Sequence, residues 1–81
     1  MEQIATFHTH FGALEFQKTC KALGDKPKMM PVPRALSASC GTCVKFQIPF
    51  DPASMSHEDL DSVYAVDGAA YRLLFHNEEE L

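Results

Sequence analysis

The chain has 81 residues, of which 46% are hydrophobic, and its seven basic and eleven acidic residues give a formal net charge of −4. This length suits one domain, the hydrophobic content excludes a disordered chain, and the negative charge argues against nucleic acid as a partner. The sequence has no apolar run as long as a membrane span, and its N-terminus lacks the pattern of a secretory signal. We therefore expect a cytoplasmic protein that has no membrane partner.

The first half of the chain predicts a strand, a helix and a second strand. Residues 3–8 alternate between two faces, which favours a strand. Residues 11–23 form the predicted helix, which ends at Gly24, a usual C-cap. Its apolar stripe, spaced by three and four residues, consists of Ala13, Phe16, Cys20 and Leu23. Residues 28–32 are predicted to be an edge strand, because Pro31 cannot donate to a sheet ladder.

The second half predicts a strand, a helix and a last strand. Residues 44–48 alternate most clearly between apolar and polar positions. Ser56 resembles the N-cap of a second helix that stops at Gly68. The apolar face of this helix would consist of Leu60, Val63 and Tyr64. Residues 70–75 are the last predicted strand, which completes a single domain over 1–76, and residues 77–81 are an acidic tail. The order β-α-β-β-α-β predicts an α+β fold of the ferredoxin-like type, an antiparallel sheet with two helices on one face.

A Cys-x-x-Cys pair, Cys40 and Cys43, lies in the loop between the second and third predicted strands. A close cysteine pair in a reducing compartment is more often catalytic or metal-binding than structural. The loop also contributes Arg34, Ser37, Ser39 and Gly41. Glycine permits a tight turn after Cys40, with a positive φ where one is needed. Because every polar group of the loop can donate to an anion and none is acidic, the loop should favour a thiolate.

The pair by itself leaves several functions open. Thioredoxin-like chemistry needs the motif at a helix N-terminus, whereas a strand follows Cys43 here. A structural zinc site needs four ligands, and beyond the two loop cysteines only His8 and His10 form a pair with suitable spacing. We interpret these histidines as ordinary strand-end residues and Cys20 as a core residue. We therefore expect neither a metal nor a cofactor.

The segment MMPVPRALSASCGTCVKF resembles the selenium/sulfur carrier-like family of small bacterial and archaeal proteins. The family pattern runs roughly P-x-P-R-x-[IL]-S-x-[SG]-C-G, and this chain matches it from Pro31 to Gly41. The segment THFGALEFQK also resembles the first helix of that family, which follows a Thr-His step. The resemblance implies a carrier rather than an enzyme, with no catalytic residue. It implies that Cys40 accepts sulfur or selenium as a persulfide or perselenide, supported by Arg34 and Gly41.

The same resemblance implies partners. A cysteine desulfurase or selenocysteine lyase would donate the chalcogen, and an enzyme such as selenophosphate synthetase would accept it. We include Ser37 and Ser39 in the expected cargo-binding loop. Cys43 lies outside the core pattern and could resolve the loaded Cys40 to a disulfide or act as a second acceptor. Two other classes stay open: a thiol redox or metal-binding module that uses both loop cysteines, and an interaction domain that forms a homodimer through a sheet edge.

Overall fold

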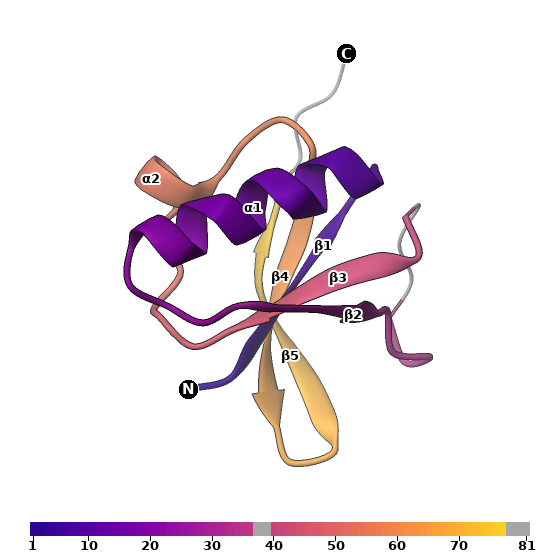
Figure 1. Ribbon diagram of the computed structural model, residues 1–81. Coiled ribbons are helices and arrows are strands. Elements are labelled where there is room, and N and C mark those ends of the chain that lie inside the picture. Colours follow the sequence, from indigo (N-terminus) through magenta and orange to yellow (C-terminus); the bar gives the residue numbers. More distant parts are fainter. Residues whose placement is uncertain (37–39, 78–81) are drawn as a thin grey trace.

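The computed structural model describes residues 1–36 and 40–77. Within these residues the elements are β1 (Gln3–Phe7), α1 (His10–Ala22), β2 (Lys28–Pro31), β3 (Thr42–Phe46), α2 (Pro52–Met55), β4 (Leu60–Asp67) and β5 (Ala70–His76) (Figure 1). The strands form one antiparallel sheet in the order β2-β3-β1-β4-β5. The fold is α+β, as predicted. The four-stranded ferredoxin-like arrangement is not confirmed, because β5 extends the sheet and α2 has only four residues.

The predicted second helix is wrong, because residues 60–67 form strand β4. Leu60 and Val63 follow one another at a helical step, but both pack into the core from the sheet. Ser56 is the C-cap of the short helix α2 and not the N-cap of a long one. The N-cap is Asp51, whose side chain accepts a hydrogen bond from the N–H of Ala53 at 3.1 Å.

Gly68 ends a strand rather than a helix. It lies in the two-residue turn between Asp67 and Ala70, which pair across the β4–β5 hairpin. Its φ of 64° is positive, and no non-glycine residue of the described chain has a positive φ. A turn with only its first central residue at positive φ matches the type II′ hairpin turn, which glycine favours at that position. Glycine at the first central position of this turn therefore signals a hairpin.

The other predicted elements are confirmed, with shifts of one or two residues at their ends. α1 begins after Thr9, whose side chain accepts from the N–H of Gly12 at 3.3 Å. It ends before Gly24, whose φ is 92°. β2 is an edge strand, as Pro31 predicted. One stripe residue differs from the prediction, since Leu23 is 52% exposed.

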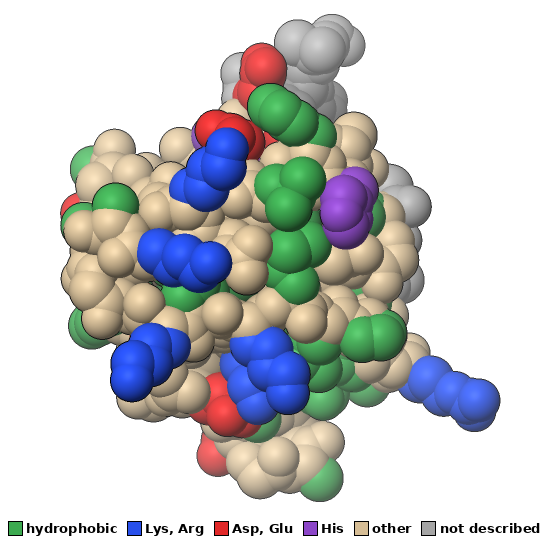
Figure 2. Space-filling view, in the orientation of Figure 1, with side chains coloured by type: hydrophobic (Ala, Val, Ile, Leu, Met, Phe, Trp, Pro, Cys, Tyr) green, Lys and Arg blue, Asp and Glu red, His purple; other side chains and the backbone are tan. Residues whose placement is uncertain are grey.

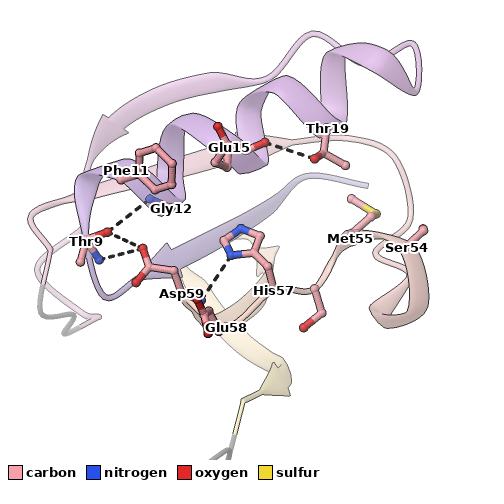
Figure 3. A pocket seen from close by; sticks show the side chains of 11 residues that line it. Thr9, Phe11, Gly12, Glu15, Thr19, Ser54, Met55, His57, Glu58 and Asp59 are labelled. Carbon is pink, nitrogen blue, oxygen red and sulfur yellow. Dashed lines mark hydrogen bonds between the residues drawn. The ribbon is translucent and has the colours of Figure 1, made fainter.

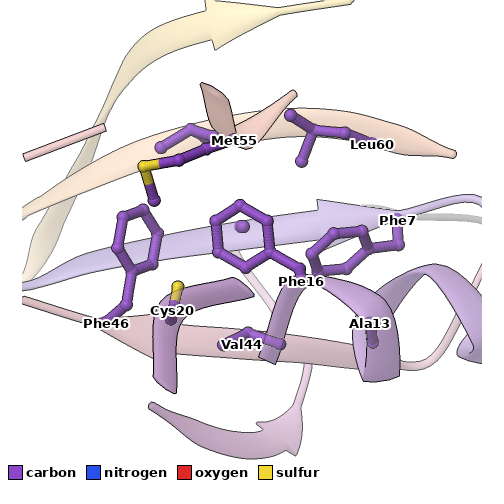
Figure 4. Packing of buried hydrophobic residues seen from close by; sticks show 10 residues of the cluster. Phe7, Ala13, Phe16, Cys20, Val44, Phe46, Met55 and Leu60 are labelled. Atoms are coloured by element: carbon purple, nitrogen blue, oxygen red, sulfur yellow. The ribbon is translucent and has the colours of Figure 1, made fainter. Parts of the chain in front are cut away.

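The hydrophobic core lies between α1 and one face of the sheet (Figure 4). Phe16 of α1 is at its centre, with its ring centroid 5.3 Å from that of Phe7 and 5.0 Å from that of Phe46. Met55 of α2 packs into the same cluster, so both helices cover this face. Ala5 and Phe7 point into it together, as the alternation of β1 predicted. Within the described residues no helix is long and apolar enough to cross a membrane.

Candidate functional site

The cysteine loop connects β2 to β3 at the closed end of the β2–β3 hairpin. Pro31 lies opposite Thr42, and the N–H of Val32 donates to the carbonyl oxygen of Gly41 at 3.1 Å. The loop lies at the end of the sheet where β1 stops, because the N–H of Cys40 donates to the carbonyl oxygen of Phe7 at 3.4 Å. Since α1 begins three residues after Phe7, the loop and the N-terminal end of α1 lie at the same end of the molecule (Figure 1).

Cys40 is the half-exposed thiol of this loop. The backbone N–H of Thr42 donates to its Sγ at 3.4 Å. On the other side of Thr42, its hydroxyl Oγ1 lies 3.4 Å from Nδ1 of His10, the first residue of α1. The backbone N–H of Thr42 thus faces the sulfur of Cys40, and the imidazole of His10 contacts the Thr42 side chain. This arrangement suits a thiolate or another anionic sulfur species.

Cys43 is close to Cys40 in sequence but lies in a different environment. It is fully buried, and its Sγ–H donates to the carbonyl oxygen of Pro31 at 3.6 Å. Because Val44 and Phe46 of β3 point toward α1, Cys43 points toward the opposite face of the sheet. Burial, with a smaller contribution from the charge of Cys40, raises the pKa of Cys43 to about 11. Cys43 is therefore protonated at neutral pH.

Cys20 is a core residue, as predicted. It is fully buried in the cluster around Phe16. Burial, followed by the negative charge of Asp25, raises the pKa of Cys20 to about 12. Of the three cysteines, only Cys40 is thus accessible to solvent.

Of the other residues predicted to bind cargo, the structure describes Arg34 and Gly41. Arg34 is exposed in a turn closed by the hydrogen bond from the N–H of Leu36 to the carbonyl oxygen of Pro33 at 3.0 Å. Within the described residues its guanidinium forms no ion pair. Gly41 does not have the positive φ that we considered, and a Cβ there would meet no atom within 4 Å. The predicted roles of Ser37 and Ser39 lie outside the described residues.

The face that carries α1 and β2 is rich in positive charge, although the chain as a whole is negative. Figure 2 shows Lys and Arg side chains spread over this face. α1 contributes Lys18 and Lys21, and β2 begins at Lys28. Only Lys18 of these three has an ion pair within the described chain, with Glu15 at 3.6 Å. A partner that approaches this face meets positive charge.

A cavity of about 650 Å³ lies between α1 and residues 54–59 (Figure 3). Its lining contains no cysteine, and Glu15, Glu58 and Asp59 give it a negative character. In Figure 3 His57 extends between α1 and this segment, and its Nδ1 accepts from the N–H of Asp59 at 3.3 Å. An anionic sulfur or selenium species is disfavoured beside three carboxylates. The cavity is therefore not a suitable cargo site.

No group of three or more His, Cys, Asp and Glu side chains within residues 1–36 and 40–77 is arranged to hold a metal ion. The histidines have separate surroundings. His8 is exposed, His10 contacts Thr42, His57 stacks on Phe7, and His76 lies 2.9 Å from Ser62 Oγ. Within the described residues, His8 and His10 do not form a metal-binding group with Cys40 and Cys43.

Sequence reasoning missed His10 and Thr42. The sequence predicts that His10 is an ordinary strand-end residue, whereas it begins α1 and contacts Thr42 of the cysteine segment. Thr42 lies between Cys40 and Cys43, and the sequence pattern predicts no part for it in cargo binding. The available signal was the placement of the loop: a helix that starts directly after β1 and a loop that returns beside β1 must meet at one end of the sheet.

A family model described as "Putative Se/S carrier protein-like" matches residues 2–50, which is more than half of the chain. The matched segment includes β1, α1, the β2–β3 hairpin and the whole cysteine loop. No curated protein and no solved structure matches the chain.

Proposed function

The chain belongs to the Se/S carrier-like family, and from that premise we propose that it carries sulfur or selenium on Cys40. The observation that supports this most strongly is the contrast between the three thiols. Cys40 is half-exposed and accepts an N–H from Thr42, whereas Cys20 and Cys43 are buried with raised pKa values. Cys40 is therefore the thiol best placed to act as a nucleophile.

The proposed loading step is a transfer of one chalcogen atom between thiolates. The Cys40 thiolate attacks the outer sulfur or selenium of a persulfide or perselenide on the donor protein. A bond forms between Cys40 Sγ and that atom, the donor's bond to it breaks, and the donor leaves as a thiolate. No net oxidation occurs, so no further reactant is needed. We propose a cysteine desulfurase or selenocysteine lyase as the donor, acting in the cytoplasm.

Delivery repeats this exchange in the opposite direction. A nucleophile of the acceptor attacks the outer atom, and Cys40 leaves as a thiolate. We propose selenophosphate synthetase or another chalcogen-using enzyme as the acceptor. In this role the protein is a carrier and not an enzyme, and the proposed contact with Arg34, Ser37, Ser39 and the backbone at Gly41 holds the anionic cargo. The positive face around α1 and β2 suits a donor or acceptor with an acidic docking surface.

Cys43 is proposed to control how long the cargo stays. Attack of its thiolate on Cys40 Sγ would form a Cys40–Cys43 disulfide and release sulfide or selenide, so the two cysteines are oxidised and the chalcogen is reduced. The burial of Cys43 and its contact with Pro31 keep this attack slow at neutral pH. Premature release should accelerate as the pH rises toward the pKa of about 11.

We also propose that the sheet is a ferredoxin-like sheet to which β5 has been added. β3 lies between β1 and β2, and β1 lies between β3 and β4, as two interleaved split β-α-β units require. In this arrangement α2 and the following segment replace the second long helix. The cysteine loop then joins the two units at one end of the sheet.

Intact-mass spectrometry tests the carrier role. The chain is incubated with a cysteine desulfurase and cysteine, or with a selenocysteine lyase and selenocysteine. Loading should add about 32 Da per sulfur or about 79 Da per selenium. Cys20→Ala should load normally, and Cys43→Ser should keep the adduct longer, most clearly above pH 8. Normal loading of both Cys40→Ser and Cys43→Ser would show that the loop is not the carrier site.

A further inference from the structure

The sulfur of Cys40 lies on the side of β3 that faces β1. The carbonyl oxygen of Gly41 points the other way, toward β2, because it accepts from the N–H of Val32 at 3.1 Å. The C=O and N–H of one trans peptide point in opposite directions, and the described chain contains no cis peptide bond. The N–H of Thr42 belongs to the same peptide unit as that carbonyl, so it points toward β1. Cys40 Sγ accepts this N–H at 3.4 Å and therefore lies on the side where β1 ends.

Helix α1 begins at the same place. β1 ends at Phe7, and His10 is the first residue of α1. Thr42 and Val44 are two residues apart on β3, so both side chains point to the helix side of the sheet, where Val44 belongs to the core. There the Oγ1 of Thr42 lies 3.4 Å from Nδ1 of His10. One residue, Thr42, thus contacts both the thiol of Cys40 and the imidazole of His10.

The surroundings of Cys40 Sγ suit an anionic cargo. The outer atom of a persulfide or perselenide lies one covalent bond beyond Sγ and carries the negative charge, which brings it within reach of the Thr42 hydroxyl. The N-terminal end of α1 adds partial positive charge, and the exposed imidazole of His8 precedes it. The carboxylate of Asp59 also lies at this end, where its Oδ2 accepts from the N–H and the hydroxyl of Thr9. That carboxylate is therefore held by Thr9, and the hydroxyl of Thr42 is left for the cargo.

We propose that Thr42 and His10 hold the outer atom of the cargo: the Thr42 hydroxyl donates to the outer sulfur or selenium, and the Nδ1–H of His10 donates to Thr42 Oγ1. This proposal rests on the carrier role of Cys40 and adds two residues to the predicted cargo-binding set. His10 acts through Thr42 and is a positioning residue, because its donation to Oγ1 directs the hydroxyl proton toward the cargo. The two donors of Thr42 have separate tasks: the N–H contacts Sγ in the empty and the loaded protein, whereas only the outer atom uses the hydroxyl.

Chemical loading separates this proposal from the carrier role, because it needs no partner protein. Inorganic polysulfide transfers one sulfur atom to the Cys40 thiolate and leaves as a polysulfide that is shorter by one atom. Every chain in the series carries Cys43→Ser, which prevents release through a Cys40–Cys43 disulfide. The polysulfide is removed and glutathione is added. Intact-mass spectrometry then follows the loss of the added sulfur, as the glutathione thiolate takes the outer atom and Cys40 leaves as a thiolate.

The lifetime of the adduct should depend on the Thr42 hydroxyl. Thr42→Val should speed the loss of sulfur by about fivefold or more, because the outer atom loses a hydrogen bond. Thr42→Ser keeps the hydroxyl and should restore most of the lifetime. His10→Ala should speed the loss by a smaller factor, and His10→Asn should restore part of it, because the amide can also donate to Oγ1. The double variant of Thr42→Val with His10→Ala should be no faster than Thr42→Val alone, since His10 acts through Thr42. His8→Ala is the matched control: it removes an exposed imidazole two residues earlier and should leave the lifetime unchanged.

The empty thiol gives the second measurement. Iodoacetamide should alkylate Cys40 at similar rates with threonine or valine at position 42, because the backbone N–H remains, and circular dichroism checks the fold. A Thr42→Val chain that keeps the full lifetime overturns the proposal, as does one whose alkylation rate changes by the same factor. A longer lifetime in His10→Ala overturns the role of His10. If polysulfide loads Cys40 but no desulfurase or lyase does, the carrier role fails and the lifetimes still decide this proposal. A Cys40 that polysulfide does not modify overturns both.

Discussion

Replacing Gly12 by alanine should destabilise the chain, although alanine is the better helix former. A Cβ at this position would lie 2.7 Å from Cγ and 2.8 Å from Cβ of Asp59, and closer still to its Oδ2. The carboxylate of Asp59 holds the start of α1, because its Oδ2 accepts from both the N–H and the hydroxyl of Thr9. The clash includes Cβ and Cγ of Asp59, so a rotation of the carboxylate end alone cannot remove it. Asp59 must move, and these hydrogen bonds must be lost or weakened.

The magnitude follows from three contributions. Forcing a methyl group into a filled space costs about 1–3 kcal/mol. The two hydrogen bonds to Thr9 are exposed, so their loss adds about 1 kcal/mol in total. The gain in helix propensity offsets at most about 1 kcal/mol. The free energy of unfolding should therefore fall by about 1–3 kcal/mol, which urea denaturation followed by circular dichroism can resolve.

A second background makes the test specific. Asp59→Gly removes the three atoms that lie nearest to the new Cβ. In that background Gly12→Ala should be neutral or stabilising by up to about 1 kcal/mol, because only the helix propensity remains. The sign of the effect should thus reverse between the two backgrounds. A Gly12→Ala protein that is as stable as the parent chain would refute the close approach of α1 to Asp59.

Three further predictions concern titrating groups. Limiting iodoacetamide at pH 8 should label Cys40 first, since a thiol with a pKa of about 11 or 12 is ionised in about one molecule in a thousand or fewer; peptide mapping that finds Cys20 labelled first would contradict this. The pKa values of Cys20 and Cys43 are both raised from 9.0 in the folded state. The free energy of unfolding should therefore be constant near pH 7–9 and fall as the pH rises toward 11, by about 1.4 kcal/mol per pH unit for each buried thiol. Cys43→Ala should reduce this slope in urea titrations. Burial tends to raise the pKa of Asp25, but the N–H groups of Gln47, Lys26 and Ile48 outweigh it and hold the pKa below 3.8. The contribution of Asp25 to stability is therefore present above pH 3.8 and is lost as the pH falls below that value. Asp25→Asn should lower the free energy of unfolding by about 1–3 kcal/mol at pH 7 and flatten its decrease in acid; an unchanged decrease in acid would argue against these hydrogen bonds.

The elements that the sequence predicted correctly are those whose local signals agree with their tertiary role. α1 has a capping threonine, an apolar stripe and a glycine after its end, and β3 alternates cleanly between its two faces. The segment from Leu60 onward was ambiguous because Leu60, Val63 and Tyr64 satisfy a helical spacing as well as a strand with an irregularity. The β-branched and aromatic content of this segment and the glycine directly after it favour the hairpin.

The site was predictable only in part. The motif identified the loop and its cysteines, but composition cannot show that two thiols three residues apart have opposite exposure. That difference arises because Cys43 belongs to β3, where it pairs with Met30, whereas Cys40 precedes the strand. The contact between His10 and Thr42 joins residues far apart in the sequence, so no local pattern could reveal it.

Peptide-level mass spectrometry after reaction with a selenocysteine lyase and selenocysteine tests most directly whether Cys40 carries the chalcogen. The loaded chain is alkylated, digested and mapped, with Cys40→Ser as the matched control. We expect an added selenium atom on the peptide of Cys40 in the parent chain and an unmodified protein in Cys40→Ser. Selenium found on Cys20 or Cys43 of the parent chain, or undiminished loading of Cys40→Ser, would contradict it.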